Sequence, residues 1–104
     1  VKQRLAVAKV TDLVEGGGRV FRAGARDILV CKVEGRVFAL DDRCTHDDGP
    51  LGEGCLDGHQ VECPRHGARF DVRDGRALRM PAVAPVKTYP VRLEDGQVFV
   101  EIEG

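Results

Sequence analysis

The chain has 104 residues, of which 42% are hydrophobic and 32% are charged, with 16 Lys and Arg residues against 17 Asp and Glu residues. This length predicts a single domain over residues 1–104, with a modest core and no room for a second catalytic domain. The balanced charge lacks the basic excess that binding to nucleic acid or to an anionic membrane favours, so we expect neither partner.

The expected location is the cytoplasm. No stretch approaches the roughly 20 apolar residues that cross a bilayer, and residues 1–5 lack the pattern of a signal peptide. In that compartment cysteines are usually free or bound to metal, so we do not expect the four cysteines to form disulfides. We also expect a monomer.

The N-terminal segment fits two patterns. Ala6 and Val10 belong to a possible helical stripe, whereas the β-branched side chains of Val7 and Val10 favour a strand. We predict a strand through Val10, ended by the glycines at 16–18.

Further along the chain, short apolar runs alternate with turns. Residues 28–33 are almost uniformly apolar, which is typical of a strand that is buried on both faces. An acidic residue followed by glycine predicts β-hairpins within Val33–Val37, Arg73–Ala77 and Leu93–Val98. Apolar residues also alternate along two C-terminal strands, at Tyr89, Val91 and Leu93 and at Val98, Val100 and Ile102. The predicted fold class is therefore all-β, mostly antiparallel.

Two short segments each combine a thiol with an imidazole. They are Cys44-Thr45-His46 and Cys63-Pro64-Arg65-His66, with 16 residues between His46 and Cys63. Each follows a predicted strand end, at residues 39–42 and 60–62. If each segment gives its sulfur to one ion and its nitrogen to a second, one ion receives two cysteines and the other two histidines. That is the ligand set of a Rieske [2Fe–2S] centre.

A single zinc ion is the alternative, because zinc accepts two cysteines and two histidines in tetrahedral geometry. Zinc sites usually separate paired ligands by two to four residues, whereas one residue separates Cys44 from His46. The spacing favours the binuclear cluster. A zinc-stabilised interaction module with no redox role remains a hypothesis.

The two segments, together with Gly67 and Phe70-Asp71, resemble the two boxes of Rieske proteins. The resemblance covers most of the chain and includes the proline-bearing segment 80–85. It implies three stacked antiparallel sheets, with the cluster-binding loops at one tip and a third loop at Met80 and Pro81 that shields the cluster. Cys44 and Cys63 would bind the inner iron, and His46 and His66 the outer, solvent-facing one.

Several positions distinguish this chain from high-potential Rieske proteins of respiratory complexes. Where those proteins carry a disulfide, this chain has Gly49 and Arg65, and it has Ala68 and Phe70 in place of their serine and tyrosine. Hydroxyl donors to the cluster sulfurs favour the more negative reduced state, so their absence lowers the reduction potential. We predict a potential near the bottom of the Rieske range, on the order of −150 mV.

The resemblance is to the ferredoxin components of bacterial aromatic-ring dioxygenase systems of the biphenyl or toluene type. It implies an electron carrier and not an enzyme, one that takes single electrons from an NAD(P)H-dependent flavoprotein reductase and passes them to a terminal oxygenase. The small subunit of an NAD(P)H-dependent nitrite reductase is an alternative. A ferredoxin that serves iron–sulfur assembly or another oxygenase is a further one.

The residues around the boxes allow two interpretations. Asp47, Asp48 and Arg65 either steer a redox partner or simply keep the loops soluble. Cys31 lies in the buried strand and is interpreted as a core residue, Cys55 as exposed between the boxes and His59 as a solvated loop residue.

Overall fold

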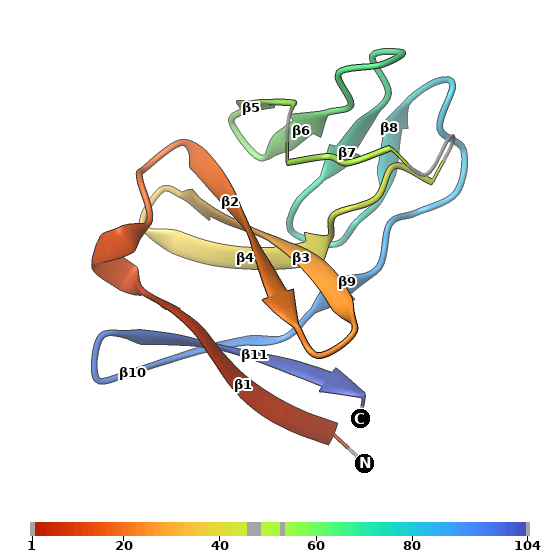
Figure 1. Cartoon of the computed structure of the whole chain (residues 1–104). Coiled ribbons are helices and arrows are strands. Elements are labelled where there is room, and N and C mark those ends of the chain that lie inside the picture. The colour runs from red at the N-terminus through yellow and green to blue at the C-terminus, as the bar shows by residue number, and fades with distance from the viewer. Residues whose placement is uncertain (1, 46–48, 53, 104) are drawn as a thin grey trace.

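The computed structural model describes residues 2–45, 49–52 and 54–103 (Figure 1). Those residues form β-strands and one short 3-10 helix, η1. The bounds are β1 Lys2–Lys9, η1 Val10–Asp12, β2 Gly17–Ala23, β3 Arg26–Val33, β4 Arg36–Asp41, β5 Cys55–Asp57, β6 Gln60–Glu62, β7 Arg69–Asp71, β8 Ala77–Arg79, β9 Thr88–Tyr89, β10 Val91–Glu94 and β11 Gln97–Glu103.

The strands make three antiparallel sheets that stack as layers (Figure 1). One outer sheet has the order β1-β11-β10, the middle sheet β2-β3-β4-β9 and the other outer sheet β5-β6-β7-β8. Both ends of the chain lie at the β1-β11-β10 layer, and the β5–β8 layer lies at the opposite end of the molecule (Figure 1). The predicted all-β fold of three antiparallel sheets is confirmed.

Two buried apolar clusters fill the spaces between the layers, and β3 contributes to both. Because successive side chains of a strand point to opposite faces, Leu29 and Cys31 enter the cluster against β5–β8. Ile28 and Val30 enter the cluster against β1-β11-β10. The middle position of this sheet explains why residues 28–33 of β3 are almost uniformly apolar, as predicted.

The three predicted hairpins are present. Glu34 has a φ of 53° between β3 and β4, and Asp95 has a φ of 51° between β10 and β11. Each is followed by glycine, so the two turns have the positive φ angles of tight hairpins. The third connection joins β7 to β8 through Gly75, whose φ is 80°.

Two details of the predicted strands are wrong. The first strand ends at Lys9, because Val10 begins η1, where the Leu13 N–H donates to the Val10 carbonyl. Leu93 was expected on an apolar face, but 48% of it is exposed. The reason is that β10 is the edge strand of an outer sheet, whereas Tyr89 lies in the middle sheet and is buried.

Candidate metal centre

Two strands of different sheets deliver the candidate cysteines. Cys44 follows the end of β4 in the middle sheet, and Cys63 follows β6 directly in the β5–β8 sheet. Each cysteine is 1% exposed, and both belong to the apolar cluster between these sheets. The structure thus places both thiols on the inner side of the site.

The second loop, residues 63–68, is closed by its own backbone. The Cys63 N–H donates to the Ala68 carbonyl at 2.7 Å, and the Gly67 N–H donates to the Cys63 carbonyl at 3.1 Å. The bonds fold Cys63 inward, while Arg65 and His66 are exposed on the outside. The two candidate ligands of this loop therefore differ in exposure as expected, with Cys63 buried and His66 exposed.

The first loop is closed in a similar way at its beginning. The Cys44 N–H donates to the Gly49 carbonyl at 2.7 Å, and Leu51 anchors the loop in the core as a fully buried side chain. The predicted ligand His46, and the neighbouring Asp47 and Asp48, lie outside the described residues.

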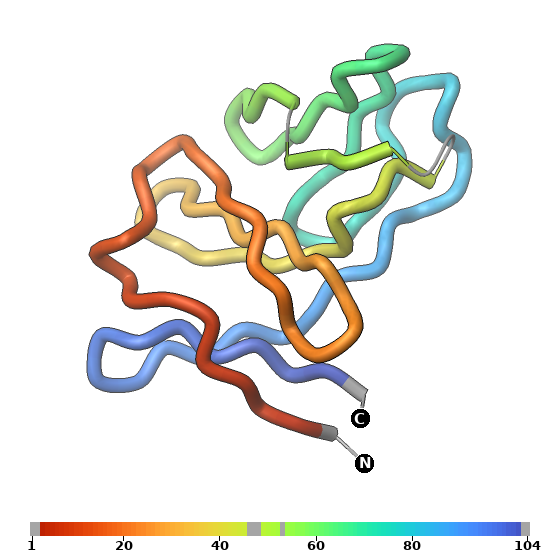
Figure 2. The backbone as a smooth tube through the Cα atoms, in the orientation of Figure 1, coloured from red at the N-terminus to blue at the C-terminus, as the bar shows by residue number. Residues whose placement is uncertain are grey.

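A third segment lies beside the first loop, as the tube in Figure 2 shows for the stretch after β8. The Thr45 hydroxyl donates to the Ala84 carbonyl at 2.7 Å and joins the two segments. Ala82 is buried in the same cluster as both cysteines, whereas Met80 is 75% exposed and Val83 is 80% exposed. Ala84 therefore lies beside the first loop while Met80 faces solvent, and the shielding role of Met80 and Pro81 stays a prediction.

Side chains also brace the base of the second loop. The Arg69 guanidinium donates to Glu62 at 2.9 Å, to Gln60 at 3.1 Å and to Asp57 at 3.2 Å. Its hydrogen bonds to Glu62 and Asp57 raise the pKa of Arg69. Since Glu62 immediately precedes Cys63, this network ties the strand that delivers the second cysteine to its neighbours.

Neither this brace nor the hydrogen bond of Thr45 can be read from the sequence. Both depend on which strands pair and which loops meet. The local sequence offers only Glu62 and Arg69 at the two ends of residues 63–68, and such Arg–Glu pairs are common on protein surfaces.

The donor set fits a binuclear iron–sulfur group. Two loops supply one buried thiol each, and the second loop adds an outward imidazole, as expected for an ion with sulfur ligands and a second ion with nitrogen ligands. Ala68 and Phe70, behind the second loop, are fully buried and carry no hydroxyl group. Across residues 2–45, 49–52 and 54–103, no three His, Cys, Asp or Glu side chains are grouped so as to hold one metal ion.

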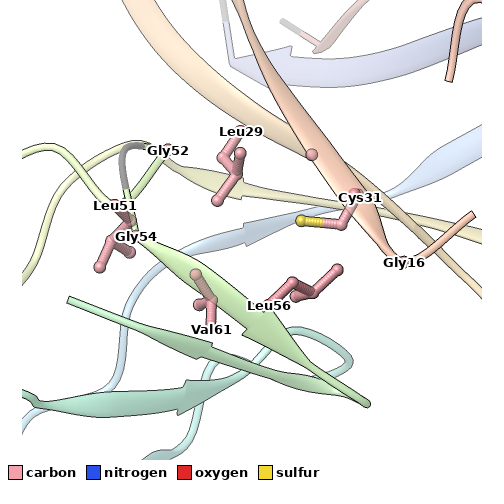
Figure 3. Close-up of a pocket in the computed structure, with 10 residues that line it drawn as sticks. Gly16, Leu29, Cys31, Leu51, Gly52, Gly54, Leu56 and Val61 are labelled. Atoms are coloured by element: carbon pink, nitrogen blue, oxygen red, sulfur yellow. The ribbon is translucent and has the colours of Figure 1, made fainter. Parts of the chain in front are cut away.

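The remaining cysteines are separate from this site. No disulfide joins any of the four cysteines, all of which lie among the described residues, and Cys31 is buried and Cys55 exposed, as predicted. Cys31 faces a cavity of about 140 Å³ between β3 and the β5–β6 hairpin, with Leu29, Leu56 and Val61 around it (Figure 3). Burial raises the pKa of its thiol to about 12, so Cys31 is a neutral core residue at physiological pH.

The interpretation of His59 as a simple solvated residue is wrong. Its ring is partly buried and packs edge-on against the Phe38 ring, with 5.8 Å between the ring centroids. Phe38 comes from β4, so the contact joins two sheets. Sequence proximity could not reveal this contact, because the partner lies about twenty positions away.

Among the described residues, no helix has the length and apolar character to cross a membrane.

Comparison with protein families finds a match over residues 3–90 to the model of the Rieske [2Fe-2S] domain. Among curated proteins, the ferredoxin component of biphenyl 2,3-dioxygenase from Rhodococcus jostii strain RHA1 is 45% identical over 93 residues, covering 89% of this chain and 87% of the relative. The naphthalene 1,2-dioxygenase system ferredoxin component of Pseudomonas putida is 37% identical over 102 residues, covering 98% of this chain and 97% of the relative.

Solved structures of ferredoxins superpose on most of this chain. The Sphingomonas yanoikuyae B1 ferredoxin superposes with a TM-score of 0.92 at 35% identity, covering 97% of this chain and all of that chain. A chain from the complex of reduced oxygenase and oxidized ferredoxin in carbazole 1,9a-dioxygenase superposes with a TM-score of 0.88 at 36% identity, covering 93% and 91%.

Proposed function

This chain belongs to the Rieske [2Fe-2S] family, and from that premise we propose that Cys44 and Cys63 bind the inner iron of its cluster and His46 and His66 the outer iron. When bound, the [2Fe–2S] cluster supplies reversible one-electron chemistry. The observation that carries this assignment is the difference between two cysteines that are 1% exposed and an exposed His66.

The protein is a ferredoxin component, an electron carrier and not a catalytic subunit. We infer that it accepts single electrons from an NAD(P)H-dependent flavoprotein reductase and passes them to a terminal oxygenase that acts on aromatic rings. The support is the set of relatives, which are ferredoxin components of biphenyl and naphthalene dioxygenase systems and cover nearly all of this chain. The known complex of an oxygenase with a related ferredoxin supports the acceptor.

The chain's own residues have two tasks in this role. The backbone bonds that close residues 63–68 hold His66 at the outer surface, where a partner can approach it. The apolar cluster around the cysteines excludes water from the inner side of the site. A rigid, preformed site of this kind keeps the reorganisation on electron transfer small.

The wider setting belongs to the same proposal. We infer one functional domain, a monomer, and a cytoplasmic location, where NAD(P)H is available to the reductase. Four cysteines without a disulfide among them, all in the described part of the chain, are compatible with a reducing compartment.

Substitution of a ligand tests the assignment. After anaerobic reconstitution, we expect the wild-type protein and the control His59→Ala to hold about two irons and two acid-labile sulfides per chain. His66→Ala should hold less than about half of that iron, because the outer ion loses one of its two protein ligands. Full iron and sulfide content and an unchanged EPR spectrum in His66→Ala would contradict the assignment.

Electron transfer is tested separately. With the reductase and oxygenase of an aromatic-ring dioxygenase system, the reconstituted wild-type protein should couple NADH oxidation to substrate hydroxylation. The iron-free protein is the control, and equal turnover with it would contradict the carrier role.

A further inference from the structure

The carboxylate of Asp42 closes the first ligand loop across its base. Its Oδ1 atom accepts a hydrogen bond of 2.6 Å from the backbone N–H of Gly52. Asp42 lies one residue beyond β4 and two residues before Cys44, and Gly52 follows the buried Leu51. This contact therefore joins the residue two positions before Cys44 to Gly52, at the far end of the first loop.

Both ends of this contact lie against the middle sheet. The Asp42 N–H donates to the Asp27 carbonyl of β3 at 3.0 Å. At Gly52, an added Cβ would lie 3.1 Å from Asp42 Oδ1 and 2.3 Å from Cγ2 of Val20 on β2. Only glycine lets the backbone come this close to β2 while it donates to the carboxylate.

Both ligand loops are closed across their bases by a side chain as well as by backbone bonds. At residues 63–68, the Arg69 guanidinium donates to Glu62 at 2.9 Å. At the first loop, the Asp42 carboxylate accepts from the Gly52 N–H. The contact at the first loop differs in that its donor belongs to the loop backbone itself.

We propose that Asp42 is a positioning residue of the metal centre, whose carboxylate oxygen fixes the loop presenting Cys44 by accepting the hydrogen bond of Gly52. It acts as an acceptor and not through its charge. This rests on the proposed function, because it takes Cys44 to be a ligand. A partly buried N–H without an acceptor is costly, so losing the bond opens the base of the loop and loosens the ligand.

Four variants separate the acceptor from the charge and from general stability. Asp42→Asn keeps an oxygen acceptor and removes the charge, whereas Asp42→Ala removes both. Gly52→Ala breaks the same contact from its other end, through the clash with Val20. Asp27→Ala is the matched control, because it removes only a surface pair in which Arg22 lies 3.1 Å from Asp27.

The first readout is the rate at which a chelator removes iron from the oxidised, loaded protein. We expect Asp42→Ala and Gly52→Ala to lose iron about tenfold faster than wild type, and Asp42→Asn and Asp27→Ala to match it within about twofold. The rate of hydrogen exchange in the peptide containing residue 52, measured on the same loaded protein, should rise about tenfold in Asp42→Ala and Gly52→Ala but not in the other two variants. The reduction potential of Asp42→Asn should match that of wild type.

Each contrary outcome has a distinct meaning. Rapid iron loss or a shifted potential in Asp42→Asn would show that the charge matters and would overturn the proposal. Wild-type iron retention and exchange in Asp42→Ala would overturn it as well. If the wild-type protein bound no iron–sulfur cluster, the proposed function would fail and this role with it, whereas normal wild-type loading leaves the variants to decide this role alone.

Discussion

Asp71 provides the strongest test of how the connection between β7 and β8 is stabilised. Its side chain is 4% exposed, and it receives three hydrogen bonds from Arg73. The Arg73 backbone N–H and Nε donate to Oδ1 at 2.9 and 3.0 Å, and Nη2 donates to Oδ2 at 2.8 Å. The Asp71 backbone also bonds to Arg76 and Gly75, so this carboxylate organises the connection between β7 and β8.

The Asp71→Asn variant removes the charge and one acceptor from this arrangement. Hydrogen bonds to charged groups contribute about 1.5–3 kcal/mol each. The Arg73 side chain is 55% exposed, so water compensates for much of that contribution, and we expect a loss of about 1–2 kcal/mol in the free energy of unfolding. For a domain of this size, each 1 kcal/mol lowers Tm by about 4–8 °C.

The pH dependence of this loss follows from the same contacts. The Arg73 side chain is the main cause that holds the pKa of Asp71 below its ordinary value of 3.8, with smaller help from the Arg73 backbone N–H. The stabilisation is therefore complete above about pH 5 and is lost as the pH falls through the lower folded pKa. In that range the unfolded state binds more protons than the folded state, so the difference between wild type and variant shrinks in acid.

Urea unfolding between pH 7 and pH 2 measures this difference. The control is Asp74→Asn, an exposed residue of the same turn that keeps an oxygen acceptor for the Arg76 N–H and should change stability by less than about 0.5 kcal/mol. Equal stabilities of Asp71→Asn and wild type at pH 7, or a difference that grows toward pH 2, would refute the reasoning.

Three further predictions concern the site and its core. Thr45→Val should lose about 1 kcal/mol of stability, since it removes the hydrogen bond to the Ala84 carbonyl, whereas Thr45→Ser should keep that hydrogen bond and the stability. Equal stabilities of the two variants in thermal unfolding would count against this contact. Cys31→Ser should lower the free energy of unfolding by about 1–3 kcal/mol, because it buries a more polar group in an apolar cluster, and Cys31→Ala should lower it less. A larger loss for Cys31→Ala in urea unfolding would contradict a core role. Spectroelectrochemical titration should give a potential on the order of −150 mV, and Ala68→Ser and Phe70→Tyr should raise it; a wild-type value far above zero would oppose the prediction.

Local chemistry in the sequence predicted much of this fold. The hairpins at Glu34 and Asp95 follow from acidic–glycine pairs, since the turn itself requires positive φ angles. The burial of Cys31 follows from the apolar run around it. The loops that present Cys44 and Cys63 follow from ligand spacing and from the strands before them.

Long-range contacts could not be predicted in the same way. The division of residues 88–94 between β9 in the middle sheet and β10 in an outer sheet depends on pairing with distant strands. The contact of His59 with Phe38 and the bond from Thr45 to Ala84 join segments that only the assembled sheets bring together. The carboxylate of Asp42 belongs to the same class, because its partner is ten positions away across the ligand loop.

Metal and sulfide analysis of the anaerobically reconstituted wild-type protein, combined with EPR after dithionite reduction, decides whether this chain carries a Rieske cluster. We expect a red-brown protein with about two irons and two acid-labile sulfides per chain, and a reduced signal of low average g value. A colourless protein that contains one zinc ion and no acid-labile sulfide would contradict it.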